Sequence, residues 1–513
     1  MRSLTLSRFV RIFSVAALLM SVGIARADDE SIIDPNANRD QASQDGVTPQ
    51  ARGPVHEAFA APSTGTAAPG PVVTKQPPES IEEMPPETKP EGDNVQWLPG
   101  YWAFDDEKSD FLWISGIWRV PPPGRQWVPG AWARVSGGWQ WSAGFWKAVE
   151  IQNLSIVPEP PAPLDEASPP APNDNSVQIP GGWVYRDTRY VWRPTCWVPF
   201  RAGWVWVPGY YVCTPCGYVY VEGYWDHVLR DRGLLFAPVC IDYRVIRPGW
   251  CFRPCYVVND LCLLGSLFVR GDCGCYFFGD YYDAIYVKRG FICFFDVRIG
   301  RRFVDPLFAY YSHAFRRAGW ERELRALSRA RFKGEAPRPP RTLVEQTKVT
   351  AHVTKSNINQ TVVLAPITTI NKKVLPVVTL NKTKVLEYQK AAAAFHEVSR
   401  DRAALEGKLL SGGTLPKKHG DAPVSLKIDL SKTPVVKDTT NLKSLPPSPL
   451  VKHEDKPIKE IKVVPAPDHK DRKEVEVRPI DVKPIINDHK DVKPIDVKPP
   501  HRGKDDRGGN RHR

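Results

Sequence analysis

The chain of 513 residues lacks the short patterns by which common enzyme classes are identified. It contains no G-x-S-x-G nucleophile motif, no H-E-x-x-H zinc motif, no phosphate-binding P-loop and no dinucleotide-binding glycine fingerprint. After residue 27 it also lacks an apolar run of about 18 residues, the length that a membrane-spanning helix needs. We therefore expect a protein without catalysis, cofactor or bound metal, whose contact with a membrane is at most peripheral.

Cysteine is absent before residue 196 and after residue 293. An even number of cysteines confined to one segment of an exported chain predicts structural disulfides, although their pairing cannot be read from the sequence. Three other uses stay open: a zinc site that joins Cys213-Thr-Pro-Cys216 to Cys251 and Cys255, redox chemistry at Cys213 and Cys216, and free thiols. The ten candidates are Cys196, Cys213, Cys216, Cys240, Cys251, Cys255, Cys262, Cys273, Cys275 and Cys293.

Apolar content is low at both ends of the chain and in one internal segment. The chain has 51 prolines, which gather in a leader (28–95), a linker (147–177) and a Lys/Pro/Asp tail (411–513) with three copies of DVKP. Such segments bury too little apolar surface to offset the entropy of ordering them. We predict that the leader and the tail are disordered and that the linker is extended.

The first residues predict export. Three arginines precede a thirteen-residue apolar run, IFSVAALLMSVGI, which is followed by Ala-Arg-Ala and then by acidic residues. This order is typical of a cleavable signal peptide, here residues 1–27, with an uncleaved anchor as the alternative. The expected location is the periplasm, the cell envelope or the outside of the cell. The net charge of +13 would suit anionic partners, but export makes nucleic acid an unexpected one.

Tryptophan is abundant and follows the pattern W-x-x-G-x-W. Eight units, most of them starting 14 residues apart, form two blocks at 96–146 and 178–225. Four positions depart from the pattern: Gln178, Thr195, Tyr211 and Tyr220. The units span 97–102, 113–118, 127–132, 141–146, 178–183, 192–197, 206–211 and 220–225. A fixed period over so many units indicates an internal repeat.

The two middle residues of a unit, such as Pro99-Gly100, suit a tight turn. A β-hairpin built on that turn would place the two aromatic residues of each unit opposite each other. The paired aromatic positions are Trp97, Trp102, Trp113, Trp118, Trp127, Trp132, Trp141, Trp146, Trp183, Trp192, Trp197, Trp206, Tyr211, Tyr220 and Trp225. We predict a mainly β protein, with an antiparallel meander of hairpins of about 14 residues that must pack together because one hairpin alone is unstable.

The words QWLPGYW, LWISGIW, QWVPGAW, QWSAGFW and WVPGYY resemble the bacterial WXXGXW (YXWGXW) repeat family over residues 96–225. The resemblance implies an exported bacterial protein and assigns no catalytic or ligand-binding residue. Two uses of the aromatic rows stay open. They form a shared core, or they lie exposed and bind polysaccharide, whose sugar rings stack on indoles.

The remaining segments have weaker signals. Residues 226–312 are rich in Cys, Tyr and Phe and are predicted to form strands. Within 313–410 we predict helices over 314–332 and over 385–410, the second containing AAAA at 391–394, with short Thr/Val-rich strands around 342–380. Asp226-His227 is the one acid–base pair beside a motif, either an exposed loop pair or a catalytic one. Asp272, Asp280 and Asp283 suit turns or a cation, and the Arg-rich face of 314–332 suits solvent or anionic lipid. The favoured function is a structural or interaction role in the cell envelope.

Overall fold

The computed structural model describes residues 31–34, 44–62, 69–186, 188–271, 274–299, 302–303, 305–350 and 362–434. The predicted signal peptide, most of the predicted tail, and both Asp272 and Cys273 lie outside these residues. The described part is mainly β, and all of its ladders between named strands are antiparallel. No helix within it is both long enough and apolar enough to span a membrane.

Consecutive Trp motifs combine in pairs, and each pair builds one long hairpin of four strand segments. In hairpin 1, the inner strands β6 and β7 pair with each other, and the outer strands β5 and β8 pair with each other. The segments are β5 (Gln96–Leu98), β6 (Tyr101–Asp105), β7 (Asp110–Ile114) and β8 (Ile117–Arg119). The motif residues between β5 and β6, and between β7 and β8, therefore bend two neighbouring strands rather than reverse the chain.

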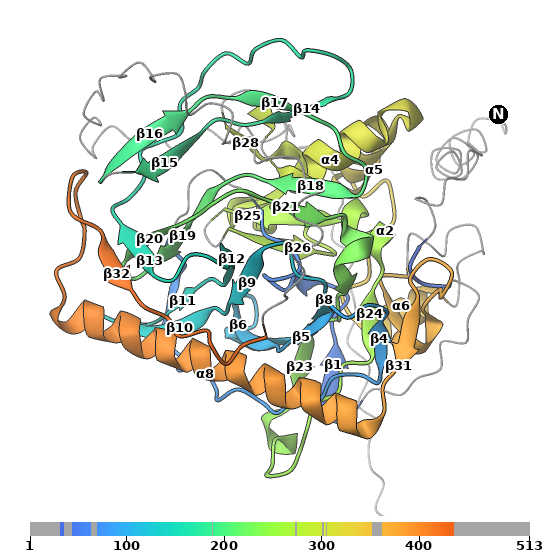
Figure 1. The fold of residues 1–513 in the computed structure, drawn as a ribbon. Coiled ribbons are helices and arrows are strands. Elements are labelled where there is room, and N and C mark those ends of the chain that lie inside the picture. The colour runs from blue at the N-terminus through green and yellow to red at the C-terminus, as the bar shows by residue number, and fades with distance from the viewer. Residues whose placement is uncertain are drawn as a thin grey trace, which may run out of the picture. The chain divides into compact units, whose positions relative to one another are not determined.

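The same nested arrangement occurs three more times, so the two blocks hold four hairpins (Figure 1). Hairpin 2 consists of β9 (Arg125–Val128), β10 (Ala131–Val135), β11 (Gly138–Ser142) and β12 (Phe145–Ala148). Hairpin 3 consists of β14 (Ser176–Ile179), β15 (Gly182–Arg186), β16 (Arg189–Arg193) and β17 (Cys196–Pro199). Hairpin 4 consists of β18 (Trp204–Val207), β19 (Tyr210–Thr214), β20 (Gly217–Val221) and β21 (Tyr224–His227).

The prediction that the two aromatic residues of one motif face each other is wrong. Each aromatic residue lies opposite one from the neighbouring motif, as Trp97 does with Trp118 and Trp102 with Trp113. The ring centroids of these two pairs are 5.1 Å apart, in edge-to-face contact. The other pairs are Trp127–Trp146, Trp132–Trp141, Trp183–Trp192, Trp206–Trp225 and Tyr211–Tyr220, while Gln178 lies opposite Trp197.

The motif glycine explains why the predicted turn does not form. Gly100 has no positive φ, whereas the chain reverses beyond the motif, near Ser109 (φ 52°). A Cβ atom on Gly100 would lie 2.7 Å from the indole of Trp113, and one on Gly116 would lie 2.6 Å from the indole of Trp97. Each motif glycine therefore provides space for the first aromatic ring of the partner motif, which needs a missing side chain rather than an unusual φ.

The departures at positions 178 and 195 compensate for each other. Thr195 replaces the glycine that would face an indole at position 178, and position 178 holds Gln instead of Trp. The Thr195 hydroxyl also accepts a hydrogen bond from the Gly181 N–H at 3.0 Å. The two changes therefore occur together because a side chain at 195 occupies the space that an indole at 178 would require.

The predicted disorder of the leader is wrong for its described residues, and the linker, predicted to be extended, contributes one strand to a sheet. Proline-containing segments add to the edges of sheets built by distant residues, so their order does not require a core of their own. In the leader, β1 (Val47–Pro49) pairs with β23, β2 (Gly53–Pro54) with β26, β3 (Val72–Val73) with β11 and β4 (Thr88–Pro90) with β31. In the linker, β13 (Leu154–Val157) lies between β20 and β32 (Val424–Leu426).

The rest of the described chain surrounds the hairpins. The strands are β22 (Gly233–Leu234), β23 (Val239–Ile241), β24 (Tyr256–Val258), β25 (Leu267–Arg270), β26 (Cys275–Phe278), β27 (Phe291–Cys293), β28 (Arg298–Ile299), β29 (Arg302–Phe303), β30 (Leu364–Pro366) and β31 (Val377–Thr379). The helices are α2 (Asp260–Gly265), α3 (Ala284–Lys288), α4 (Pro306–Ala314), α5 (Trp320–Phe332), α6 (Leu343–Thr350) and α8 (Lys382–Gly412). The predicted helix over 385–410 corresponds to α8, but 343–350, predicted as strand, is helical.

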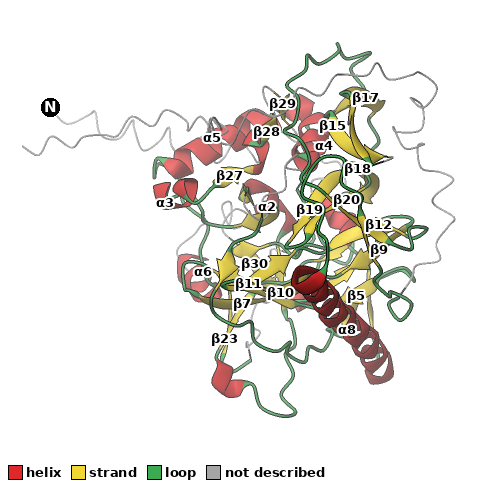
Figure 2. Cartoon of the chain, turned by 90° about the vertical axis from the view of Figure 1, so that its left-hand side faces the viewer, coloured by secondary structure: helices red, strands yellow, loops and turns green. Residues whose placement is uncertain are grey.

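Helix α8 lies along β5, β9 and β10, so it covers hairpins 1 and 2 (Figures 1 and 2). Arg402 donates hydrogen bonds to the carbonyl oxygens of Pro129 and Ala143, both at 2.9 Å, and forms an ion pair with Glu406. Glu406 in turn accepts a hydrogen bond from the Ser142 hydroxyl at 2.7 Å. Both charged side chains are fully buried, so they fix the helix against the bends of hairpin 2.

Candidate functional site

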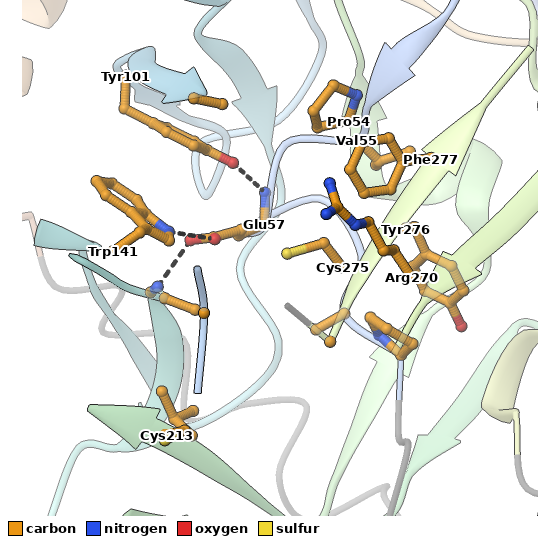
Figure 3. A pocket seen from close by; sticks show the side chains of 18 of the residues that line it. Pro54, Val55, Glu57, Tyr101, Trp141, Cys213, Arg270, Cys275, Tyr276 and Phe277 are labelled. Atoms are coloured by element: carbon orange, nitrogen blue, oxygen red, sulfur yellow. Dashed lines mark hydrogen bonds between the residues drawn. The ribbon is translucent and has the colours of Figure 1, made fainter. Parts of the chain in front are cut away.

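A cavity of about 130 Å³ lies where hairpins 1, 2 and 4 meet the β25–β26 ladder (Figure 3). Its wall is mostly apolar and aromatic, with one buried carboxylate, two thiols and one guanidinium. The residues that line it include Glu57, Tyr101, Trp132, Trp141, Cys213, Arg270 and Cys275. Concave apolar sites with a few polar groups are the usual location of small-molecule binding in proteins.

Glu57 is the central polar residue of this cavity. It lies in the loop after β2 and is 8% exposed. Its carboxylate accepts hydrogen bonds from the Trp141 indole N–H and from the Gly144 N–H, both at 2.7 Å, and its own N–H donates to the Tyr101 hydroxyl (Figure 3). Burial raises the pKa of Glu57 to about 7, although the two hydrogen bonds oppose this shift. Glu57 therefore joins a leader segment to the bend of hairpin 2.

His56 does not complete an acid–base pair with Glu57. Its Nδ1 accepts a hydrogen bond from the Ala58 N–H at 3.1 Å, and its Nε2 therefore donates to the Pro99 carbonyl at 3.1 Å. Burial lowers the pKa of His56 to about 4, so the ring is neutral near pH 7. Both ring nitrogens are used in holding the leader against hairpin 1.

The arrangement at Glu57 recurs in two other hairpins. In hairpin 1, the Glu83 carboxylate accepts hydrogen bonds from the N–H groups of Gly100 (2.8 Å) and Gly116 (2.9 Å), and from the Trp113 indole (3.3 Å). In hairpin 3, Glu166 accepts from the Thr195 N–H (2.6 Å) and the Trp192 indole (3.0 Å). We call each of these three sets a carboxylate bridge. Sequence reasoning missed all three, because a glutamate in a Pro-rich segment usually lies in solvent.

The predicted aromatic residues form core rather than an exposed row. Ten of the fifteen are buried: Trp97, Trp102, Trp113, Trp118, Trp127, Trp146, Trp192, Trp206, Tyr211 and Trp225. The other five are partly exposed: Trp132, Trp141, Trp183, Trp197 and Tyr220. Trp132, Trp141 and Tyr211 line the cavity. One face of Trp141 is covered by Tyr101, whose ring centroid lies 5.1 Å away at an interplanar angle of 13°.

The nine described cysteines form no disulfide, so the predicted framework is absent among them. They are instead used singly. The Cys216 thiol donates to the Glu406 carbonyl in α8, and the Cys293 thiol contacts the Ser328 hydroxyl in α5. Burial raises the pKa of Cys213 to about 11 and of Cys216 to about 12, which keeps both as thiols and disfavours the redox alternative. No cluster that could hold a metal ion occurs among the described residues.

The sequence treated Asp226 and His227 as an exposed or catalytic pair, but Asp226 is a buried residue of β21. Its carboxylate accepts two hydrogen bonds from Arg119, at 2.6 and 2.7 Å, and lies 3.2 Å from the Arg232 guanidinium. The His227 ring stacks against Trp204. The ion pair joins hairpin 1 to hairpin 4, which is why the carboxylate is buried.

The two other charged candidates also bind protein groups. Asp280 and Asp283 form ion pairs with Arg341, at 2.8 and 2.9 Å, rather than a cation site. On α5, Arg331 is 4% exposed and donates to the Gly265 carbonyl and the Tyr282 hydroxyl. The predicted solvated arginine face is therefore wrong at this position, because part of it packs inward.

Searches with this chain found no matching family model, no matching curated protein and no matching solved structure.

Proposed function

We propose that this chain is an exported protein of the cell envelope with a structural or interaction role and without catalytic activity. The observation that supports this most directly is the use of the repeated aromatic residues. Seven cross-strand aromatic pairs join neighbouring motifs inside the hairpins. A repeat whose repeated residues are buried builds a rigid body, and leaves recognition to the loops and edges around it.

The polar groups support the same proposal. Glu57 has both carboxylate oxygens occupied by protein donors, and burial raises the pKa of the Cys213 thiol in the cavity wall to about 11, which disfavours its thiolate. Arg270 forms an ion pair with Asp106 at 2.5 Å. These groups are arranged to hold segments together, since a nucleophile next to an available base would be needed for covalent chemistry.

Quenching of tryptophan emission by a polar quencher, combined with cell fractionation, tests this proposal. We expect weak quenching that wall polysaccharide does not change, and recovery of the chain from the envelope or periplasmic fraction. Strong quenching that polysaccharide prevents would show that indoles serve as a binding surface. Recovery from the cytoplasm would contradict the envelope assignment.

A carbohydrate-binding role is the second candidate, and the structure favours one place for it. The cavity combines Trp132 and Trp141 with the carboxylate of Glu57, which is the chemistry that a hydroxylated ring requires. Its volume suits one sugar ring at most. Calorimetric titration with monosaccharides tests this candidate. Binding that Trp132→Phe weakens, while the matched control Trp183→Phe in hairpin 3 leaves it unchanged, would favour it over the purely structural role.

A further inference from the structure

Hairpin 4 has the framework of a carboxylate bridge without a carboxylate from the described chain. In hairpins 1, 2 and 3 the bridge uses the N–H at the glycine position of the second motif, supplied by Gly116, Gly144 and Thr195. Gly223 holds this position in hairpin 4. Its N–H donates no hydrogen bond to any residue that the structure describes. Gly223 is buried, so an unpaired amide there carries a cost in free energy.

The second donor of the bridge is of the same chemical kind in hairpins 1, 2 and 3. The indole N–H of Trp113, Trp141 or Trp192 donates to the glutamate in the three filled bridges. Hairpin 4 has Tyr220 at this position, and its hydroxyl can donate one hydrogen bond. The bends match as well, because a Cβ atom on Gly223 would lie 2.7 Å from Trp206, as one on Gly116 would lie 2.6 Å from Trp97.

The charges around this bend suit an anion. Arg125 donates to the Gly223 carbonyl at 3.0 Å, and its buried Nη1 has no hydrogen-bond partner among the described residues. Burial raises the pKa of Tyr220 to about 12, and the charge of Glu222 acts in the same direction, while the nearby cations Arg193, Arg186 and Arg125 oppose the shift. The acidic neighbour Glu222 is exposed. Three cations therefore lie near a pair of donors that lack a carboxylate.

We infer that the bend of hairpin 4 is a docking site for a glutamate side chain of another protein. The three filled bridges indicate the kind of segment that fits. Glu57, Glu83 and Glu166 each lie within three residues of a proline, in a stretch that belongs to no strand or helix. The partner is thus an extended, proline-containing segment whose glutamate binds Gly223, Tyr220 and Arg125. This inference rests on the proposed interaction role and specifies the partner's chemistry.

Calorimetric titration of the full chain with a short peptide tests the site. The probe is the acetylated and amidated peptide Pro-Leu-Asp-Glu-Ala-Ser, the sequence that surrounds Glu166, and its control carries Gln in place of Glu. A charge-assisted hydrogen bond contributes enough that we expect the Gln peptide to bind about tenfold more weakly. Tyr220→Trp supplies the indole N–H of the other bridges and should tighten binding of the Glu peptide, whereas Tyr220→Phe should weaken it.

Equal affinity for the two peptides would overturn the inference, as would equal affinity of Tyr220→Trp and Tyr220→Phe for the Glu peptide. Near-ultraviolet circular dichroism of both variants shows whether the fold is kept, and Tyr220→Phe is conservative enough to serve if the larger side chain is not accommodated. Absence of peptide binding with unchanged envelope location would refute this site alone, because fractionation and quenching test the broader role independently.

Discussion

The compensation between positions 178 and 195 allows a test of the strand pairing without unfolding the protein. Gln178→Trp alone places an indole against the Thr195 side chain, and overpacking of this kind costs about 1–3 kcal/mol. Thr195→Gly alone loses the hydrogen bond from Gly181, which is worth about 1 kcal/mol, and adds the backbone entropy of glycine, about 0.5–1 kcal/mol. Together the two changes restore the space that a motif glycine provides for the indole at position 178. They also restore the cross-strand aromatic pair with Trp197, which contributes about 0.5–1.5 kcal/mol.

The double variant should therefore lie within about 1.5 kcal/mol of the wild type in stability. The coupling free energy between the two sites is the relieved overpacking plus the aromatic pair, about 1.5–4.5 kcal/mol. Urea denaturation of the four proteins of the double-mutant cycle measures this value. The matched control combines Gln178→Trp with Thr188→Gly, at the turn of the same hairpin, where Thr188 has a φ of 64° and additivity is expected. Additivity of the 178 and 195 substitutions would refute the register and the role of the motif glycine.

Three further predictions concern the buried polar groups. Burial raises the pKa of Glu83 from 4.5 to about 7, so between these pH values the folded chain keeps a proton that the unfolded chain releases. The contribution of this group to the free energy of unfolding is therefore full below about pH 4.5 and is lost as the pH rises to 7. The wild type should lose about 3 kcal/mol more than Glu83→Gln across this window, and parallel pH curves in urea denaturation would contradict that. Arg402→Leu leaves the buried Glu406 carboxylate without its ion-pair partner and should lower the free energy of unfolding by about 3–5 kcal/mol. Proteolysis in α8 should then be faster, and the double variant Arg402→Leu/Glu406→Leu should recover stability. Proteolysis of the single variant at the wild-type rate would argue against this role of the ion pair. Thiol titration without reductant should detect all nine described cysteines as free thiols after denaturation, and fewer thiols would indicate disulfides. In the native protein at pH 8, Cys216 and Cys293 should react slowly, because burial raises the pKa of both thiols to about 12.

The sequence was sufficient for the coarse architecture. The W-x-x-G-x-W repeat predicted antiparallel strands at 96–146 and 178–225, and the alanine-rich stretch near 391–394 predicted the long helix that α8 confirms. It was not sufficient for the pairing partners, because a period of 14 fits a turn inside each motif as well as a turn between motifs. The two departures Gln178 and Thr195 held the missing information, since only the observed register brings them together.

The cavity and the bridges were beyond sequence reasoning for a different reason. Glu57, Glu83 and Glu166 lie in Pro-rich stretches, where local composition indicates solvent exposure. Their burial depends on donors that the hairpins provide from distant positions, such as the 87 residues that separate Glu57 from Gly144. Long-range hydrogen bonds of this type produce no periodic pattern in the sequence from which they could be predicted.

Hairpin 2 is contacted by segments from near both ends of the described chain, which has a consequence for how the protein folds. The bend between β11 and β12 contacts Glu57 from near the beginning of the chain, and both bends contact Arg402, which is 345 positions after Glu57. The Glu57 contacts need only the chain up to Gly144, but the Arg402 contacts cannot form until α8 has been synthesised, so hairpin 2 is completed only when most of the polypeptide is present. Folding should be slow, as expected for contacts so far apart in sequence, and a chaperone that shields the indoles during that interval would be a physiological requirement.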